Sequence, residues 1–164
     1  MSQGAEGKLE EVRGALSRRI GFLLQRAHNR LREAILSALD GSGLNPGQLA
    51  ILGALAVAND VTQRELIAAT GIEKSSMVIF LDRLEADGWV ERRPHPNDRR
   101  ARAIHLTEQG RARLAVVGPG LEAAEAQFVA LLSNDEKERL IDMLRRLNRI
   151  PDGNDPTDPA RGGA

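Results

Sequence analysis

The sequence contains no cysteine, which excludes disulfide bonds, thiolate zinc sites, cysteine nucleophiles and thiol-based redox sensing. Aromatic residues are scarce, because the chain contains only Phe22, Phe80, Trp89 and Phe128. Proteins that bind single-stranded nucleic acids, and most RNA-binding modules, stack bases on exposed aromatic side chains. The composition therefore argues against those partners.

Long apolar segments are also missing. The longest apolar run, residues 49–58, has about half of the ~20 residues that a membrane-spanning helix requires. The N-terminal residues lack the apolar core of a secretory signal peptide. The sequence therefore predicts a cytoplasmic protein without a membrane partner.

No enzymatic site is recognisable in the sequence. His28, His95 and His105 fall in different predicted elements, without the spacing of a metal site. A Gly-rich phosphate loop and a nucleophile elbow are both absent from the sequence. The sequence therefore predicts no metal, no cofactor and no enzymatic activity.

The charges balance, with 23 basic and 23 acidic residues, which argues against bulk electrostatic binding to nucleic acid. Their distribution is uneven, because five arginines and only two acids lie between positions 91 and 102. The arginines are Arg92, Arg93, Arg99, Arg100 and Arg102, and the acids are Glu91 and Asp98. This segment is either a solvated turn or a surface that contacts DNA.

Apolar periodicity predicts a mainly helical protein of 164 residues. A disordered polar tail over residues 1–12 should precede a long helix from Arg13 to Leu39, and the tail 151–164 should also be disordered. Further helices are expected at 46–58, 63–70, 74–87, 108–117, 121–132 and 134–147. Gly118-Pro119-Gly120 predicts a kink or break between the helices at 108–117 and 121–132, because proline removes a backbone donor.

Capping signatures mark several helix starts. Asn45 with Gln48, Thr62 with Glu65, and Ser133 with Glu136 each fit a capping box, in which side chains and backbone N–H groups satisfy one another. Glu73 and Thr107 are single-residue cap candidates, and Gly71 fits the left-handed end of a helix. The chain from Thr62 therefore predicts a short helix, a tight turn and a longer helix.

The helix over 74–87 should bury Met77, Phe80, Leu81 and Leu84. Its opposite face centres on Ser75 and Ile79, with Val78 near the edge. Singly exposed apolar residues are common and need no function. Alternatively, these two contact the methyl groups of thymine in a major groove.

Alternation predicts two strands, 89–93 and 102–106, around a loop at 94–101 that contains two prolines. Helix, turn, helix and basic hairpin together indicate a protein that binds double-stranded DNA.

The middle of the chain resembles the MarR family of bacterial transcription regulators. The resemblance covers roughly residues 13–150 and rests on motifs in a fixed order. These are Asn45-x-x-Gln48, Gln63-x-Glu65-Leu66, Gly71-Ile72, Lys74-Ser75-Ser76-Met77, Leu81-Asp82-Arg83-Leu84-Glu85, Gly88-Trp89-Val90-Glu91-Arg92-Arg93, Asp98-Arg99-Arg100-Ala101 and Leu106-Thr107-Glu108-Gln109-Gly110.

The resemblance implies a mainly α fold with a small β-hairpin wing, a winged helix-turn-helix flanked by N- and C-terminal dimerisation helices. Residues 13–44 would be a dimerisation helix, 45–107 the DNA-binding module and 108–150 further dimerisation helices. Implied DNA contacts are Thr62, Lys74, Ser75, Ser76, Val78, Ile79, Arg83, Asp98, Arg99 and Arg100. Arg100 would enter the minor groove and Asp98 would brace it. The family often has polar or basic residues where this chain has Val78 and Ile79.

The implied function is a ligand-responsive repressor that binds a pseudo-palindromic operator as a homodimer. The apolar stripes at 16–38, 121–132 and 140–147 fit a dimer interface, but they could instead pack on one another within one chain. The effector would be a small aromatic or phenolic compound, with Arg26 and His28 as weak contact candidates that equally fit an ordinary helix surface. A regulator without a ligand, one controlled by an antagonist protein, and a pure interaction scaffold remain alternatives. A scaffold would not need the arginines of the wing.

Overall fold

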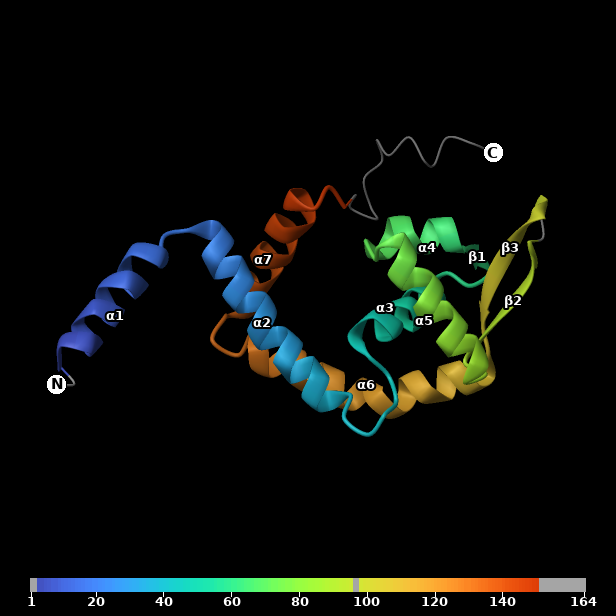
Figure 1. Ribbon diagram of the computed structural model, residues 1–164, viewed down its shortest axis with the longest axis horizontal. Coiled ribbons are helices and arrows are strands. Elements are labelled where there is room, and N and C mark those ends of the chain that lie inside the picture. Colours follow the sequence, from blue (N-terminus) through green and yellow to red (C-terminus); the bar gives the residue numbers. More distant parts are fainter. Residues whose placement is uncertain (1–2, 96–97, 151–164) are drawn as a thin grey trace. The chain divides into compact units, whose positions relative to one another are not determined.

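The computed structural model describes residues 3–95 and 98–150, and gives only the backbone of residues 3–6, 9–10 and 98–100. One compact unit ends at Glu125 and a second begins at Ala126. The first unit holds α1 (Gln3–Leu16), α2 (Ile20–Ala38), α3 (Pro46–Val57), α4 (Gln63–Thr70), α5 (Lys74–Ala86) and the sheet (Figure 1). Helix α6 (Glu108–Phe128) crosses the boundary, and α7 (Asn134–Leu147) lies in the second unit. The predicted disordered tail at 151–164 falls outside the described residues.

The core of the first unit joins α3, α4 and α5 to the sheet. Ten side chains there are almost fully buried: Ile51, Leu52, Leu55, Leu66, Met77, Leu81, Leu84, Val90, Ile104 and Leu106. Burying one such side chain contributes about 1.5–3 kcal/mol. The predicted fold class, mainly helical with a small hairpin wing, is confirmed.

The sheet is antiparallel, with strand order β1-β3-β2 among the described strands β1 (Val61–Thr62), β2 (Val90–His95) and β3 (Asp98–Leu106). Both wing strands extend further into the predicted loop than expected, and Pro94 pairs with Arg102. Proline is tolerated because β2 is an edge strand, which has one side free of ladder bonds. β1 was not predicted, since two residues are too few to show alternation.

The predictions for the N-terminal region were wrong in two respects. Residues 3–12, expected to be disordered, are helical as part of α1. Their Ala, Glu and Lys residues are strong helix formers, so a polar composition did not mean disorder here. The single helix expected from Arg13 to Leu39 is interrupted between Leu16 and Ile20, where Arg19 is extended. The Ser17 hydroxyl donates to the carbonyl of Gly14 at 2.7 Å and so competes with continuation of the helix.

Of the kink or break predicted at Gly118-Pro119-Gly120, the break is wrong, because α6 continues through Pro119. Proline normally clashes with the Cβ of the preceding residue in a helix, but Gly118 has no Cβ. Buried Val117 and Ala124 on either side hold the helix against its neighbours. Packing therefore offsets the missing backbone hydrogen bond.

Of the helices in the described ranges, none is both long enough and apolar enough to cross a membrane.

Candidate nucleic-acid interface

Helix α4 begins with the capping box predicted at Thr62 and Glu65. The Glu65 carboxylate accepts hydrogen bonds from the Thr62 backbone N–H at 2.6 Å and its hydroxyl at 2.7 Å, and the Glu65 N–H donates back to that hydroxyl. The backbone bond from Thr62, followed by the hydroxyl bond, lowers the pKa of Glu65. Thr62, a predicted DNA contact, thus has a structural role in starting the helix, and its contact with DNA stays a prediction.

The turn between α4 and α5 is built on Gly71, whose φ of 69° is left-handed as predicted. Glu73 occupies the N-cap position of α5, but its side chain makes no hydrogen bond to the backbone of the helix. The carboxylate instead accepts from the Ser75 hydroxyl at 2.7 Å. Glu73 thus occupies the predicted cap position, but its carboxylate bonds to the Ser75 hydroxyl and to no backbone N–H of the helix.

Helix α5 separates into the two faces that the sequence predicts. Met77, Leu81 and Leu84 are fully buried, and Phe80 packs partly buried at the edge of the core. On the other side Ile79 is 66% exposed and Val78 is 39% exposed. Lys74, Ser75 and Arg83 are also exposed, and Ser76 is half-buried. The helix thus presents a mixed apolar and polar surface whose position is set by a fully packed inner face.

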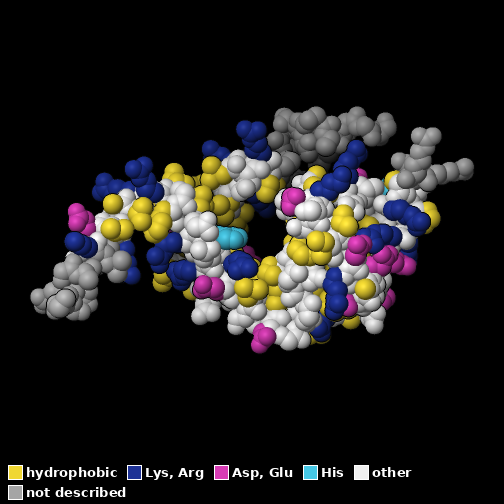
Figure 2. Space-filling view, in the orientation of Figure 1, with side chains coloured by type: hydrophobic (Ala, Val, Ile, Leu, Met, Phe, Trp, Pro, Cys, Tyr) yellow, Lys and Arg dark blue, Asp and Glu magenta, His cyan; other side chains and the backbone are white. Residues whose placement is uncertain are grey.

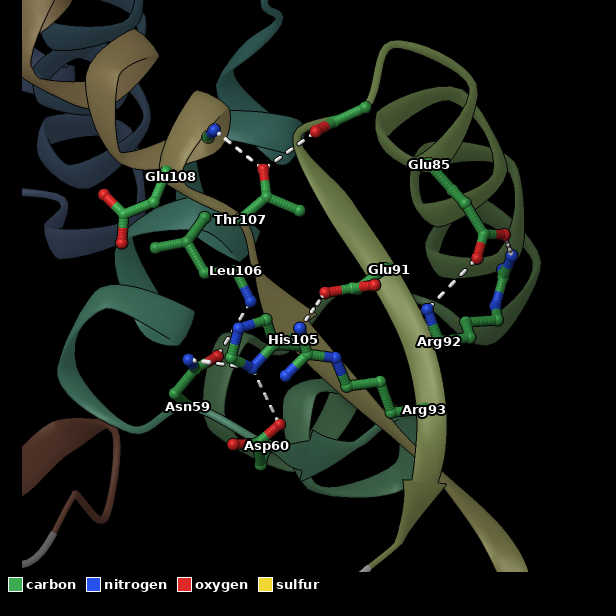
Figure 3. Close-up of polar contacts among 12 residues, drawn as sticks. Asn59, Asp60, Glu85, Glu91, Arg92, Arg93, His105, Leu106, Thr107 and Glu108 are labelled. Atoms are coloured by element: carbon green, nitrogen blue, oxygen red, sulfur yellow. Dashed lines mark hydrogen bonds and ion pairs between the residues drawn. The ribbon is translucent and has the colours of Figure 1, made fainter.

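Arg92 of β2 ties the wing to α5. Its guanidinium pairs with Glu85, and its backbone N–H donates to the same carboxylate at 3.1 Å (Figure 3). The guanidinium also pairs with Asp82 at 2.6 Å. Burial alone would lower the pKa of Arg92, but the hydrogen bonds to Asp82 and Glu85 outweigh it and raise the pKa. The two acids lie three residues apart on one face of the helix, so a single arginine reaches both. This clamp fixes the wing against α5.

A second wing arginine also forms an ion pair within the chain. Arg93 pairs with Glu91 on the same strand (Figure 3). Of the five arginines that the sequence gathers here, two therefore already have carboxylate partners, and Arg102 is exposed. The side chains of Asp98, Arg99 and Arg100 lie outside the described residues, and only their backbone is placed, in β3.

A polar cluster anchors β3 to the segment before β1. Asn59 accepts from the Leu106 N–H at 2.8 Å, which points its amide nitrogen at Nδ1 of His105, 3.1 Å away (Figure 3). Nδ1 also lies 2.9 Å from the Asp60 carboxylate. Asp60 has a φ of 60°, a left-handed conformation that Asp adopts more readily than most residues. No local sequence pattern predicts this cluster, because Asn59 and Asp60 lie about 45 residues from His105 and Leu106.

Thr107 caps α6 as predicted and closes the base of the wing. Its hydroxyl accepts from the Gly110 N–H at 3.0 Å and lies 2.8 Å from the carbonyl of Gly88 (Figure 3). A Cβ at Gly110 would stand 2.2 Å from the carbonyl oxygen of Trp89. Glycine is therefore required there for α6 to approach the wing so closely.

The two weak effector candidates lie on α2. The guanidinium of Arg26 stands 5.8 Å from the ring centroid of Phe22, and His28 is exposed. Within the described side chains, no group of three His, Asp or Glu residues gathers that could hold a metal ion.

Comparison with known proteins agrees with this architecture. A family model described as "MarR family" matches residues 42–101. The putative transcriptional regulatory protein for the hcr operon of Thauera aromatica is 30% identical over 141 residues, which are 85% of this chain and 85% of that protein.

Solved structures of the transcriptional repressor CouR are similar over most of both chains. CouR bound to a 23-mer DNA duplex has a TM-score of 0.76 and 33% identity, and the match covers 84% of this chain and 97% of that one. CouR from Rhodococcus jostii RHA1 bound to p-coumaroyl-CoA has a TM-score of 0.77 and 30% identity, covering 84% and 96%.

Proposed function

This chain belongs to the MarR family of DNA-binding transcriptional regulators, and we propose that it is a ligand-responsive repressor that binds a pseudo-palindromic operator as a homodimer. The observation that carries the proposal is the outward face of α5, where Ile79 and Val78 are exposed above a fully buried inner face. An element held this firmly, with apolar groups facing solvent, suits insertion into a major groove.

The proposed contacts divide by chemistry. Val78 and Ile79 contact thymine methyl groups, whereas Ser75 and Ser76 bond to base edges or phosphates. Lys74 and Arg83 approach phosphates; Arg83 first has to exchange its ion pair with Asp87, which is 2.9 Å long on an exposed surface. In the wing, Arg99 and Arg100 reach a minor groove, where narrow A·T-rich sequence attracts arginine, and Asp98 braces Arg100.

The homodimer is supported by apolar surface that one chain leaves uncovered. Helix α2, whose side chains are all described, has no buried residue, and Ile20, Leu23 and Leu24 are exposed along it. Figure 2 shows hydrophobic side chains at the surface along this helix. Helix α7 likewise has no buried residue and exposes Ile141, Met143 and Leu147. A second copy would bury these residues and place two recognition helices about one turn of DNA (~34 Å) apart.

Ligand response is supported by the similarity to CouR, which has been crystallised with p-coumaroyl-CoA. For this chain we propose a small aromatic or phenolic effector, free or as a thioester, with Arg26 and His28 as candidate contacts. The coupling must be reciprocal, so that operator DNA weakens effector binding by the same factor.

Selection of binding sites from a random duplex library tests the proposal, with the wild type and Ile79→Ser compared in parallel. The wild type should return a two-fold symmetric consensus, and Ile79→Ser should change the base preference at A·T positions by about 1 kcal/mol or more per site. Val57→Ser, an exposed change at the end of α3, is the matched control and should return the wild-type consensus. An asymmetric consensus, or the same consensus for Ile79→Ser, contradicts the proposal.

A further inference from the structure

Residues 73–87, which form α5 and its two caps, contain four acids, and one of them has no cationic partner. The other three pair with arginines, and they are Asp82, Glu85 and Asp87. The fourth, Glu73, is exposed at the N-cap position. Among the residues whose side chains are described, no cation pairs with it. Its negative charge is therefore available to a group outside the chain.

The carboxylate of Glu73 is held over the outward face of α5. Its Oε2 atom accepts from the Ser75 hydroxyl at 2.7 Å, and Ser75 lies at the centre of that face. Within the described part of the chain, its Oε1 atom has no hydrogen-bond partner. One oxygen of the carboxylate is thus held by the protein and the other is an open acceptor.

The backbone at Glu73 is fixed as well. The Glu73 carbonyl accepts from the N–H of Met77 at 2.9 Å, and Met77 is fully buried. The turn before it is closed by the Gly71 N–H, which donates to the Ile67 carbonyl at 2.9 Å. A side chain on such a rigid support can make contacts that depend on exact geometry.

The rest of the outward face offers few groups for hydrogen bonds to base edges. Val78 and Ile79 are apolar. Arg83 is already paired with Asp87 at 2.9 Å. In helix-turn-helix proteins the N-terminal residues of the helix in the major groove contact the base edges. Hydrogen-bonded recognition of bases by α5 therefore falls to its N-terminal end, where Glu73 lies.

The chemistry of a carboxylate restricts which base it can contact, because it accepts hydrogen bonds and cannot donate them. In the major groove guanine and thymine present acceptors and no donor. Adenine presents a donor next to an acceptor, whereas cytosine presents the donor of its N4 amino group alone. Cytosine is therefore the base that fits a carboxylate best.

We propose that Glu73 recognises one cytosine in each half-site of the operator. This inference rests on the proposed function, because it requires α5 to lie in the major groove. Oε1 accepts from the N4 amino group of the cytosine, while the Ser75 hydroxyl holds Oε2. With any other base at that position, the carboxylate faces DNA without a matching donor. Glu73 thus contributes specificity more than affinity, by penalising the wrong sequences.

Selection from a random duplex library tests the inference, with wild type, Glu73→Gln and Glu73→Ala in parallel. The wild-type consensus should contain a C·G pair in each half-site that depends on Glu73. Glu73→Gln should select adenine at that position, because an amide bonds both N6 and N7 of adenine. Glu73→Ala should accept all four bases there. Glu11→Gln, an exposed change on α1, is the matched control and should return the wild-type consensus.

Fluorescence anisotropy with the selected operator measures the size of the contact. Exchanging that C·G pair for T·A in one half-site should weaken wild-type binding about tenfold, and binding of Glu73→Ala less than about twofold. Glu73 makes no hydrogen bond to the N–H groups of the helix, so both variants should fold as the wild type does. Circular dichroism checks this.

The outcomes separate this inference from the function on which it rests. A wild-type selection without a two-fold symmetric consensus overturns the proposed function, and this inference with it. A symmetric consensus that lacks a C·G pair overturns this inference alone, whether or not the variants fold. It is also overturned alone if Glu73→Ala still selects cytosine, or if the C·G exchange weakens wild type and Glu73→Ala equally.

Discussion

Helices α3 and α2 both carry apolar stripes, but only the stripe of α3 is buried within its own chain. Ile51, Leu52 and Leu55 of α3 have no exposed surface, whereas α2 buries no side chain and Ile20 is 72% exposed. The difference shows that the winged helix-turn-helix core is finished within one chain. The apolar surface of α2 is available for a partner, in agreement with the proposed homodimer.

Helix α5 has a buried apolar face and an exposed face on the same element. Its inner face is as completely buried as that of α3, and its outer face is as exposed as that of α2. A substitution on one face should therefore affect stability, and one on the other should affect binding.

The largest expected effect is in the core. Leu81→Ala should lower the free energy of unfolding by about 3 kcal/mol, because it removes buried methyl groups and leaves a cavity. Urea denaturation followed by circular dichroism measures this. Ile79→Ala on the exposed face is the matched control and should change stability by less than about 0.5 kcal/mol. Equal losses for the two variants would mean that α5 does not have two distinct faces.

The next effect concerns association through α2. The double change Leu23→Ser and Leu24→Ser should weaken self-association at least tenfold, about 1.4 kcal/mol, because it removes apolar surface that a second copy covers. Sedimentation velocity over a dilution series measures the dissociation constant. Substituting Val57→Ser, an exposed residue at the end of α3, provides the control. Unchanged association of the double variant would remove α2 from the interface.

A smaller effect is expected at the clamp between α5 and the wing. Arg92→Gln should cost about 1 kcal/mol of stability, since it leaves Asp82 and Glu85 facing each other without a cation. It should also weaken operator binding, which fluorescence anisotropy measures. Arg93→Gln breaks a more exposed pair and should cost less than about 0.5 kcal/mol. If Arg93→Gln has the larger effect on stability, Arg92 is not the residue that holds the wing.

The smallest effect belongs to the cap of α4. Thr62→Ala should reduce stability by about 0.5–1 kcal/mol at neutral pH. Thr62 lowers the pKa of Glu65 below its ordinary value of 4.5, so this contribution is present above pH 4.5 and is lost as the pH falls through the lowered value. The stability difference between wild type and variant should therefore shrink in acid. A difference that grows below pH 4.5 would contradict the assigned hydrogen bonds.

Local chemistry explains what the sequence could predict. The capping boxes at Asn45, Thr62 and Ser133 and the left-handed turn at Gly71 depend on residues within a few positions of one another. The two faces of α5 follow from helical periodicity in the same way, and the exposure of Ile79 could be read from it.

Predictions failed where packing, or contact with residues distant in the sequence, determines the local structure. Pro119 remains helical because of Gly118 and the surrounding core, and His105 meets Asp60 only through the sheet. The count of five wing arginines was correct, but it did not reveal that Arg92 and Arg93 neutralise acids of the protein itself. Charge available for DNA is therefore smaller than the composition indicates.

The clamp at Arg92 has a mechanical consequence. With β2 bound to α5 through both a guanidinium and a backbone N–H, we expect α5, the proposed recognition helix, and the base of the wing to turn together. The proposed major-groove contact of α5 and the proposed minor-groove contact of the wing would then move together. In the proposed homodimer, an effector that tilts this body slightly would shift both contacts out of register at once, so a small displacement would suffice to release the operator.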